Sequence, residues 1–113
     1  MGKDNRDRAE IPPGTLDMLI LKTLARGANH GYGIAERIQQ ISDDVLQIEE
    51  GSLYPALQRM LIKGWIAAEW GQSENNRRAR FYKLTPSGRK QLATELSEFD
   101  RVMRAITRVI QTA

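Results

Sequence analysis

Basic side chains that could bind an anionic polymer gather in one part of this 113-residue sequence. Eight basic residues and only two acidic ones lie between positions 59 and 90, although the whole chain carries 17 basic and 14 acidic residues. Arg77, Arg78 and Arg80 fall within or beside a polar, turn-forming stretch. An exposed arginine cluster is suited to phosphate oxygens or to a narrow minor groove, so nucleic acid is the leading candidate partner. The alternative is a solvated loop that only keeps the protein in solution.

The sequence lacks the residue sets that catalysis or metal binding requires. It has no cysteine, and His30 is its single histidine. Glu49 and Glu50 are adjacent, so their carboxylates would point apart in a strand. There is no glycine-rich phosphate loop and no nucleophile elbow. We therefore expect no enzyme and neither a metal nor a cofactor.

Length limits the chain to one domain. No apolar run approaches the roughly 20 residues of a membrane span, and the N-terminus lacks the apolar core of a signal peptide. With no cysteine as well, the sequence favours the cytoplasm and predicts no membrane partner. Residues 1–10 are almost all polar and precede a Pro-Pro-Gly breaker, so positions 1–13 are predicted to be a disordered leader.

A short helix is predicted over residues 51–64, with both ends marked. Ser52 is a suitable N-cap, Pro55 is expected in the first turn, and Gly64 suits a left-handed position after the last turn. One apolar face is predicted to be buried, formed by Leu53, Leu57, Met60 and Leu61. The other face is small at its start, polar in the middle and basic at its end, as suits a helix in a DNA major groove. The alternative is an ordinary amphipathic surface helix.

The predicted DNA contacts come from this helix and from the basic loop. Its leading half would meet base edges or adjacent phosphates, and the loop would meet phosphates or a minor groove. The residues expected to contact DNA are Ser52, Tyr54, Pro55, Ala56, Arg59, Lys63, Arg77, Arg78 and Arg80.

The remaining elements surround that helix. One helix is predicted from Thr15 to Gly27, a second opens at His30, and residues 45–48 suit a short strand. Residues 65–70 and 80–84 alternate with period two on either side of the polar stretch 71–78, which predicts a β-hairpin with a basic tip. Its core-facing residues should be Ile66, Ala68, Tyr82 and Leu84. Trp65 and Trp70 are expected to cover the hairpin base and helix ends rather than to stack on bases.

A long final helix begins at Thr85-Pro86, an N-cap followed by proline at the first helical position. Its apolar residues are spaced alternately four and three apart, a heptad seam, and they are Leu92, Leu96, Phe99, Met103, Ile106 and Ile110. A helix of this length would project beyond a small core, so its seam requires a partner. The simplest partner is a second copy of the chain. The alternative is packing on its own domain, which we expect for its first third.

This order of elements is the winged helix-turn-helix plan, a mainly α fold with a small β-hairpin and a C-terminal dimerisation helix. Residues 14–85 would form the DNA-binding domain and 86–113 the dimerisation helix.

The sequence also resembles the PadR family of transcriptional regulators. The stretches that carry the resemblance are Gly14-Thr15-Leu16-Asp17, His30-Gly31-Tyr32-Gly33-Ile34, Gly51-Ser52-Leu53-Tyr54-Pro55-Ala56-Leu57, Lys63-Gly64-Trp65-Ile66 and Phe81-Tyr82-Lys83-Leu84-Thr85-Pro86-Ser87-Gly88. The short C-terminal helix resembles the smaller subfamily, and residues 69–78 are similar to a branch found beside genes for permease-like membrane proteins.

The resemblance implies a homodimeric repressor that binds double-stranded DNA at an inverted repeat. Many members release DNA when a small aromatic effector binds near the dimer interface. Trp65, Phe99 and Met103 are the candidate effector residues here, as apolar groups near the expected junction of wing, core and dimer helix. The last helix has no tryptophan, which argues against a flat ligand held between two tryptophans of that helix. The alternative function is a winged-helix protein-interaction module that does not bind DNA.

Overall fold

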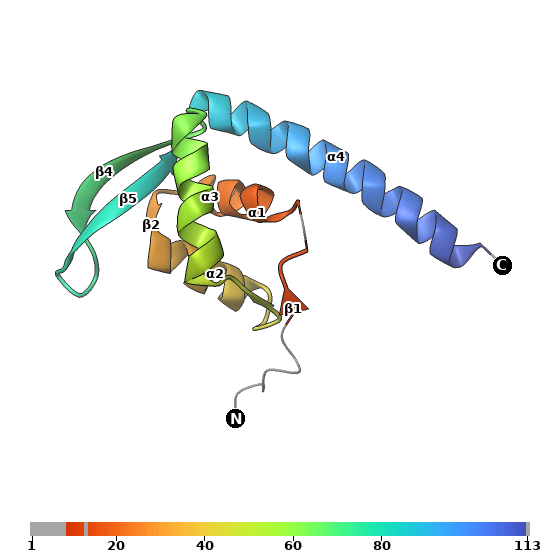
Figure 1. Cartoon of the computed structure of the whole chain (residues 1–113), viewed down its shortest axis with the longest axis horizontal. Coiled ribbons are helices and arrows are strands. Elements are labelled where there is room, and N and C mark those ends of the chain that lie inside the picture. Colours follow the sequence, from red (N-terminus) through yellow and green to blue (C-terminus); the bar gives the residue numbers. More distant parts are fainter. Residues whose placement is uncertain (1–8, 13, 113) are drawn as a thin grey trace.

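Four helices and a three-stranded antiparallel sheet make up most of the protein in a computed structural model that describes residues 9–12 and 14–112 (Figure 1). The helices are α1 (Leu16–Leu24), α2 (Gly31–Ile41), α3 (Glu50–Ile62) and α4 (Pro86–Gln111). The strands are β1 (Ala9–Glu10), β2 (Asn29–His30), β3 (Leu46–Gln47), β4 (Ile66–Gln72) and β5 (Arg78–Leu84). The predicted class, mainly helical with a small hairpin, is confirmed.

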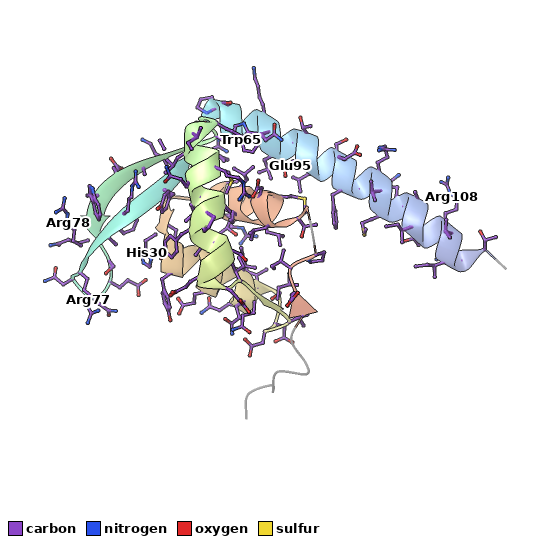
Figure 2. All side chains as sticks on the ribbon, viewed as in Figure 1. His30, Trp65, Arg77, Arg78, Glu95 and Arg108 are labelled. Atoms are coloured by element: carbon purple, nitrogen blue, oxygen red, sulfur yellow. The ribbon has the colours of Figure 1, made fainter. Side chains whose placement is uncertain are left out.

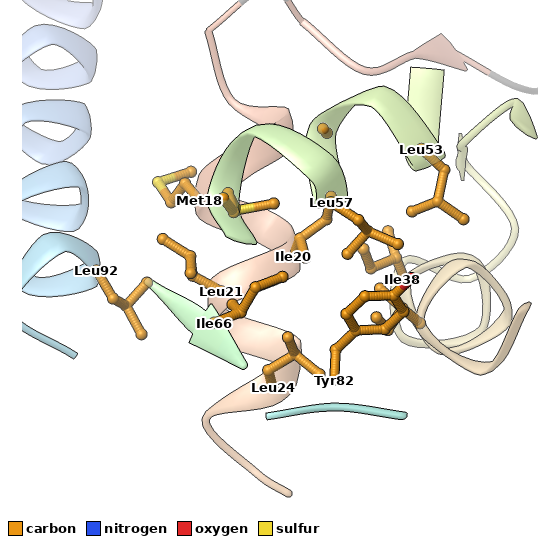
Figure 3. Packing of buried hydrophobic residues seen from close by; sticks show 13 residues of the cluster. Met18, Ile20, Leu21, Leu24, Ile38, Leu53, Leu57, Ile66, Tyr82 and Leu92 are labelled. Carbon is orange, nitrogen blue, oxygen red and sulfur yellow. The ribbon is translucent and has the colours of Figure 1, made fainter. Parts of the chain in front are cut away.

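A single hydrophobic cluster joins α1, α2, α3, the hairpin and the start of α4 (Figure 3). Its members are the apolar residues that recur at i, i+3 and i+4 on the helices, together with the inward positions of the two hairpin strands. They are Met18, Ile20, Leu21, Leu24, Ile34, Ile38, Leu53, Ala56, Leu57, Met60, Ile66, Tyr82 and Leu92. Three helices are therefore held against one face of the sheet.

Helix α3 begins earlier than the sequence suggested. The carbonyl of Glu49 accepts hydrogen bonds from the amides of both Ser52 and Leu53, so the first helical residue is Glu50 and the N-cap is Glu49. The prediction that Ser52 caps the helix is wrong, and Pro55 lies in the second turn rather than the first. Proline leaves the carbonyl of Gly51 without its usual partner, a loss that is tolerable because both residues are exposed to solvent.

The end of α3 agrees with prediction. Lys63 closes the helix, and Gly64 follows with a φ of 77°, the left-handed conformation that glycine adopts without steric cost. This turn leads directly into the hairpin. The amide of Trp65 bonds to the carbonyl of Met60, which fixes the first strand against the end of the helix.

The hairpin is longer than predicted, because each strand continues two residues further towards the tip. β4 and β5 pair antiparallel with Ile66 opposite Leu84 and Gln72 opposite Arg78, leaving residues 73–77 as the turn. Asn76 has a φ of 58°, which asparagine tolerates better than most residues. β2 pairs with the other edge of β5, giving the order β2-β5-β4. Ile66 and Tyr82 are buried and Ala68 and Leu84 pack against the core, as predicted.

The N-terminal side contains an element that the sequence did not predict. Ala9 and Glu10 form β1, which pairs parallel to β3. The predicted disordered leader is therefore wrong for these two residues. For residues 1–8 and 13 that prediction lies outside the described residues.

Helix α4 starts where the sequence predicted and ends at Gln111. The hydroxyl of Thr85 accepts the amide of Gly88 at 3.0 Å, and Pro86 occupies the first helical position. A Cβ at Gly88 would collide with the carbonyl oxygen of Trp65, so glycine permits close packing of the helix start on the hairpin. Beyond Leu92 the helix leaves the core and projects away from the body (Figure 1).

Candidate nucleic-acid interface

The start of α2, the start of α3 and the hairpin tip line one continuous depression. A groove of about 870 Å³ lies between α2 and the tip, lined by residues that include His30, Arg37 and Arg77. A hollow of about 410 Å³ lies between α2 and the start of α3. Tyr32 lines both spaces, so the two are adjacent. Figure 2 shows Arg77 and Arg78 on the hairpin beyond His30.

Three of the predicted residues in the first two turns of α3 are exposed, but among them Tyr54 alone lines this depression, and Ser52 lines a separate hollow beside Ile11 and Leu16. Ser52, Tyr54 and Pro55 lie on the outer side of the first two turns. Ala56 is completely buried in the core, so the prediction that its side chain faces DNA is wrong. The buried stripe of α3 follows the spacing 53, 56, 57 and 60, which includes the alanine.

Tyr54 is held in a fixed position by its neighbours. A Cβ at Gly31 would lie 2.9 Å from the ring of Tyr54, so the ring packs closely on the first turn of α2. Partial burial, with contributions from Glu50 and Tyr82, raises the pKa of the Tyr54 hydroxyl. The hydroxyl therefore stays protonated at neutral pH and can donate a hydrogen bond to an anion.

Arg59 is engaged within the chain. Its guanidinium donates to the carboxylate of Asp17 on α1 at 2.9 Å. The side chain of Arg59 is 54 % exposed and that of Asp17 24 %. The pair therefore connects α1 and α3 across a sequence separation of 42 residues. A contact between Arg59 and DNA would have to share or replace this bond.

Lys63 lies away from the other predicted DNA contacts. It closes the C-terminal end of α3, about 20 Å along the helix axis from Glu50 at 1.5 Å per residue. Its ammonium lies 4.5 Å from the centre of the Trp65 ring at the base of the hairpin. The fold does not bring it together with the hairpin tip.

The wing, the hairpin residues 66–84, presents the three predicted arginines. Arg77 is in the turn, and Arg78 and Arg80 are on the outer half of β5. The guanidinium carbon of Arg78 lies 4.5 Å from the Trp70 ring centre, and that of Arg80 lies 5.9 Å from the Tyr82 ring centre. Within residues 9–12 and 14–112, no ion pair engages any of the three. Their charges are available to an anionic partner.

His30 has a structural position. Its Nδ1 accepts the amide of Gly33 at 3.0 Å, which caps α2, and its ring meets Phe81 edge-on at 5.3 Å between centroids. Nδ1 must be unprotonated to accept that bond. Across the described part of the chain, no group of three or more His, Asp or Glu side chains could hold a metal ion.

Sequence reasoning missed two residues of this surface, Tyr32 and Arg37 on α2. Both line the groove beside the hairpin tip, and Tyr32 is 66 % exposed. The motif His30-Gly31-Tyr32-Gly33 carried a signal, since an aromatic residue between two glycines at a helix start is unusual for a core position. The position of Arg37 in the groove depends on the packing of α2 beside the hairpin, which no local pattern reveals.

Within one chain, one of the three candidate effector residues, Trp65, lies apart from the other two. Trp65 packs beside Gly88 at the start of α4. Phe99 follows eleven residues later, about 16 Å along the helix. Met103 lies one turn further out.

The heptad seam of α4 is buried only at Leu92. The exposed members are Leu96, Phe99, Met103, Ile106 and Ile110, the last of them 75 % exposed. Val102 and Val109 are also exposed on this helix, so the apolar stripe is wider than the predicted seam.

These features define a winged helix-turn-helix of the DNA-binding kind, with α3 in the position of the DNA-reading helix (here called the reader helix), a basic wing and a projecting C-terminal helix. The profile of the PadR-like family of transcriptional regulators matches residues 20–94. The chain belongs to this family. It is therefore a regulator of transcription rather than an enzyme, and DNA binding is the activity that the family's fold serves.

Solved structures of other regulators superpose on most of the chain. A transcriptional regulator from Clostridium thermocellum is 28 % identical with a TM-score of 0.79, covering 87 % of this chain and 95 % of that one. A PadR family regulator from Eggerthella lenta is 25 % identical with a TM-score of 0.76, covering 88 % and 85 %. A PadR family regulator from Clostridium difficile is 28 % identical with a TM-score of 0.73, covering 86 % and 99 %.

None of the helices formed by the described residues is both long enough and apolar enough to cross a membrane.

Proposed function

We propose that the chain is a transcriptional repressor that binds, as a homodimer, an operator made of two inverted half-sites. The observation that carries this proposal is the wing. Arg77, Arg78 and Arg80 are exposed and have no carboxylate partner among the described residues, and Arg77 and Arg78 line the depression that leads to the start of α3. Phosphate neutralisation by such side chains supplies most of the affinity of a protein for DNA.

The reader helix would enter the major groove with its first two turns. Ser52 and Pro55 are short and exposed there, which allows the backbone to approach base edges. The hydroxyl of Tyr54 can donate a hydrogen bond to a phosphate. Tyr32 and Arg37, on α2, would also bind phosphates. Arg59 would contribute less to DNA binding, because its guanidinium already donates a hydrogen bond to Asp17. Lys63 can reach only flanking phosphates, if DNA extends to the far end of α3.

Glu49 and Glu50 restrict how DNA can lie. They are exposed at the beginning of α3, where carboxylates stabilise the helix dipole but repel phosphates. A phosphate strand should therefore avoid the tip of α3 and run beside it, over α2 and the wing. A carboxylate at this point can still accept a hydrogen bond from the amino group of cytosine.

The dimer would form through α4. An apolar stripe from Leu96 to Ile110 is exposed in the single chain, and its heptad spacing suits a twin helix. A two-fold dimer presents two identical reader helices, so the matching operator is an inverted repeat with half-sites about one helical turn, or a multiple of it, apart.

An effector site in this protein would be formed between subunits. The backbone of Trp65 lies against Gly88, which is about 16 Å along α4 from Phe99, so a ligand that touches both Trp65 and Phe99 would need the partner's helix. Titration of planar aromatic compounds into the Trp70→Phe variant, which leaves Trp65 as the sole tryptophan, measures binding there by fluorescence. Unchanged fluorescence across a broad panel of such compounds would mean that Trp65 only packs against the core and does not bind an effector.

Binding to the chain's own promoter region over a series of salt concentrations tests the main proposal. We expect log affinity to fall steeply and linearly with log salt, a footprint with two-fold symmetry, and lower reporter expression from that promoter when the protein is present. The second candidate is a protein-interaction module on the same fold, which the wide apolar stripe of α4 favours. That module would show little DNA binding at any salt concentration. As a DNA-binding repressor the protein would act in the cytoplasm.

A further inference from the structure

Trp70 is a large aromatic side chain that the fold leaves in solvent. It is 60 % exposed and stands outside the hydrophobic cluster, whereas Trp65 is half-buried and packs against that cluster. An exposed indole in the middle of a strand contributes little to folding. The expectation that Trp70 covers the hairpin base is therefore wrong, because β4 carries it beyond the core.

The neighbour of Trp70 is a charged group. Gln72 is opposite Arg78 and Trp70 is opposite Arg80, so Trp70 and Arg78 are diagonal neighbours on one face of the hairpin. The guanidinium carbon of Arg78 lies 4.5 Å from the centre of the indole ring. A cation in this position is attracted by the negative face of the ring.

We propose that Trp70 is a positioning residue that holds the Arg78 guanidinium ready to bind DNA phosphates, and that this stacked pair binds the phosphate backbone without entering the minor groove. The inference rests on the proposed DNA-binding function. A guanidinium held over the ring face by its charge still has N–H groups that point away from the ring, and these groups can bind phosphate oxygens. A side chain already held in place loses less conformational entropy when DNA binds.

The thickness of the pair excludes groove entry. The guanidinium carbon lies 4.5 Å from the ring centre, so with the van der Waals radius of each group added, the pair measures about 8 Å along that line. The minor groove of B-DNA is about 6 Å wide. Arg77 is in the turn and has no aromatic partner among the described residues, so it is the wing arginine that can enter a groove. The two adjacent arginines therefore have different tasks.

A double-variant cycle measured by DNA-binding anisotropy tests this division. The proteins are the full-length parent, Trp70→Ala, Trp70→Tyr, Arg78→Ala and Trp70→Ala with Arg78→Ala. The probes are a mixed-sequence duplex and an A-tract duplex, each over a salt series. We expect Trp70→Ala to weaken binding about 2- to 5-fold per wing on both duplexes, with Trp70→Tyr close to the parent. Its salt slope should stay unchanged because the phosphate contact remains.

Removing the arginine itself has a different signature. Arg78→Ala should lower the salt slope by about one and leave the A-tract preference intact. The double variant should bind like Arg78→Ala alone, because Trp70 has nothing left to hold. Arg108→Ala, on α4 far from the hairpin (Figure 2), is the matched arginine control and should bind like the parent. Thermal melting should be alike for all, since the altered side chains are exposed.

Two results would overturn the inference while the proposed function stands. In the first, the parent binds DNA and Trp70→Ala binds equally well. In the second, Trp70→Ala weakens binding by the same factor with and without Arg78, so that the indole acts by itself. A loss of A-tract preference in Arg78→Ala would disprove the backbone-only contact. If the parent shows no salt-dependent DNA binding, the proposed function fails, and this inference with it.

Discussion

The hairpin and helix α4 both project beyond the core, yet they expose opposite chemistry. On the outer half of the hairpin the exposed groups include Arg77, Arg78 and Arg80, and the Arg78 guanidinium lies over the ring of Trp70. On the outer two-thirds of α4 the exposed groups include Leu96, Phe99 and Met103. The hairpin is stiffened by its own ladder and turn hydrogen bonds, whereas the projecting part of the helix is held by its backbone hydrogen bonds and by exposed ion pairs.

This difference indicates which partner each projection meets. An apolar stripe gains free energy only by leaving water, so it needs a surface of the same kind, and a twin helix offers one. Exposed arginines gain little from burial and bind an anion across a wet interface. One small core therefore supports two surfaces that need different partners. The substitutions below test whether the helix serves dimerisation and the hairpin serves DNA binding.

Charge placed on the helix should have the largest effect. Leu96→Asp with Met103→Asp would bury carboxylates in the proposed seam, so we expect a monomer at micromolar concentration and operator affinity lower by orders of magnitude, since two half-sites no longer act together. Analytical ultracentrifugation and anisotropy measure both effects. A double variant that still sediments as a dimer would show that the interface lies elsewhere.

Removal of charge from the wing should leave the dimer intact. Arg77→Ala with Arg78→Ala is expected to weaken binding to operator and to random DNA. The salt slope should fall by about one for the phosphate contact of Arg78, and by up to about two in total when Arg77 also neutralises phosphates beside a groove. Sedimentation should match the parent. Equal binding of random DNA by parent and variant at low salt would rule out the wing as a phosphate clamp.

A bulky residue on the reader helix should affect sequence recognition only. Ser52 is exposed on α3, so Ser52→Leu should cost operator binding about 1–3 kcal/mol while random DNA binding stays nearly unchanged. Competition between the two DNAs measures the ratio.

The same kind of substitution at Ala56, four residues after Ser52, should lower the stability of the fold rather than sequence recognition. Ala56 is completely buried, so Ala56→Leu should lower the free energy of unfolding by about 1–3 kcal/mol through overpacking. Chemical denaturation measures the loss. A variant as stable as the parent but deficient in operator binding would place Ala56 on the DNA side after all.

The smallest effect is expected on the outward side of α4. Arg101 donates to Glu98, which lowers the pKa of that carboxyl, but both groups are fully exposed. Because the folded-state pKa is the lower one, any stabilisation is present above the ordinary carboxyl range and is lost as pH falls through the folded pKa. Glu98→Gln should therefore leave the melting temperature and dimerisation unchanged at neutral pH. A clear loss of dimer would bring this side of the helix into the interface.

Local patterns in the sequence were sufficient for the two projections. Thr85-Pro86 predicted the start of α4, and period-two alternation predicted which hairpin residues face the core. These signals act between residues that are two to four apart, through caps, turns and side-chain direction. The error at Ser52 has a related cause. The local pattern does not show at which residue the first turn begins, whereas the hydrogen bonds to the carbonyl of Glu49 do.

Tertiary structure decided what depends on partners distant in sequence. Asp17 meets Arg59, and Ala9 pairs beside Leu46, through contacts between residues that are far apart in the sequence. Residue types and spacing by themselves determined a basic wing, a reader helix and an apolar seam. The packing of separate elements decides which arginine is paired with a carboxylate, as Arg59 is, and which lies over an aromatic ring, as Arg78 does. No periodicity along the chain contains that information.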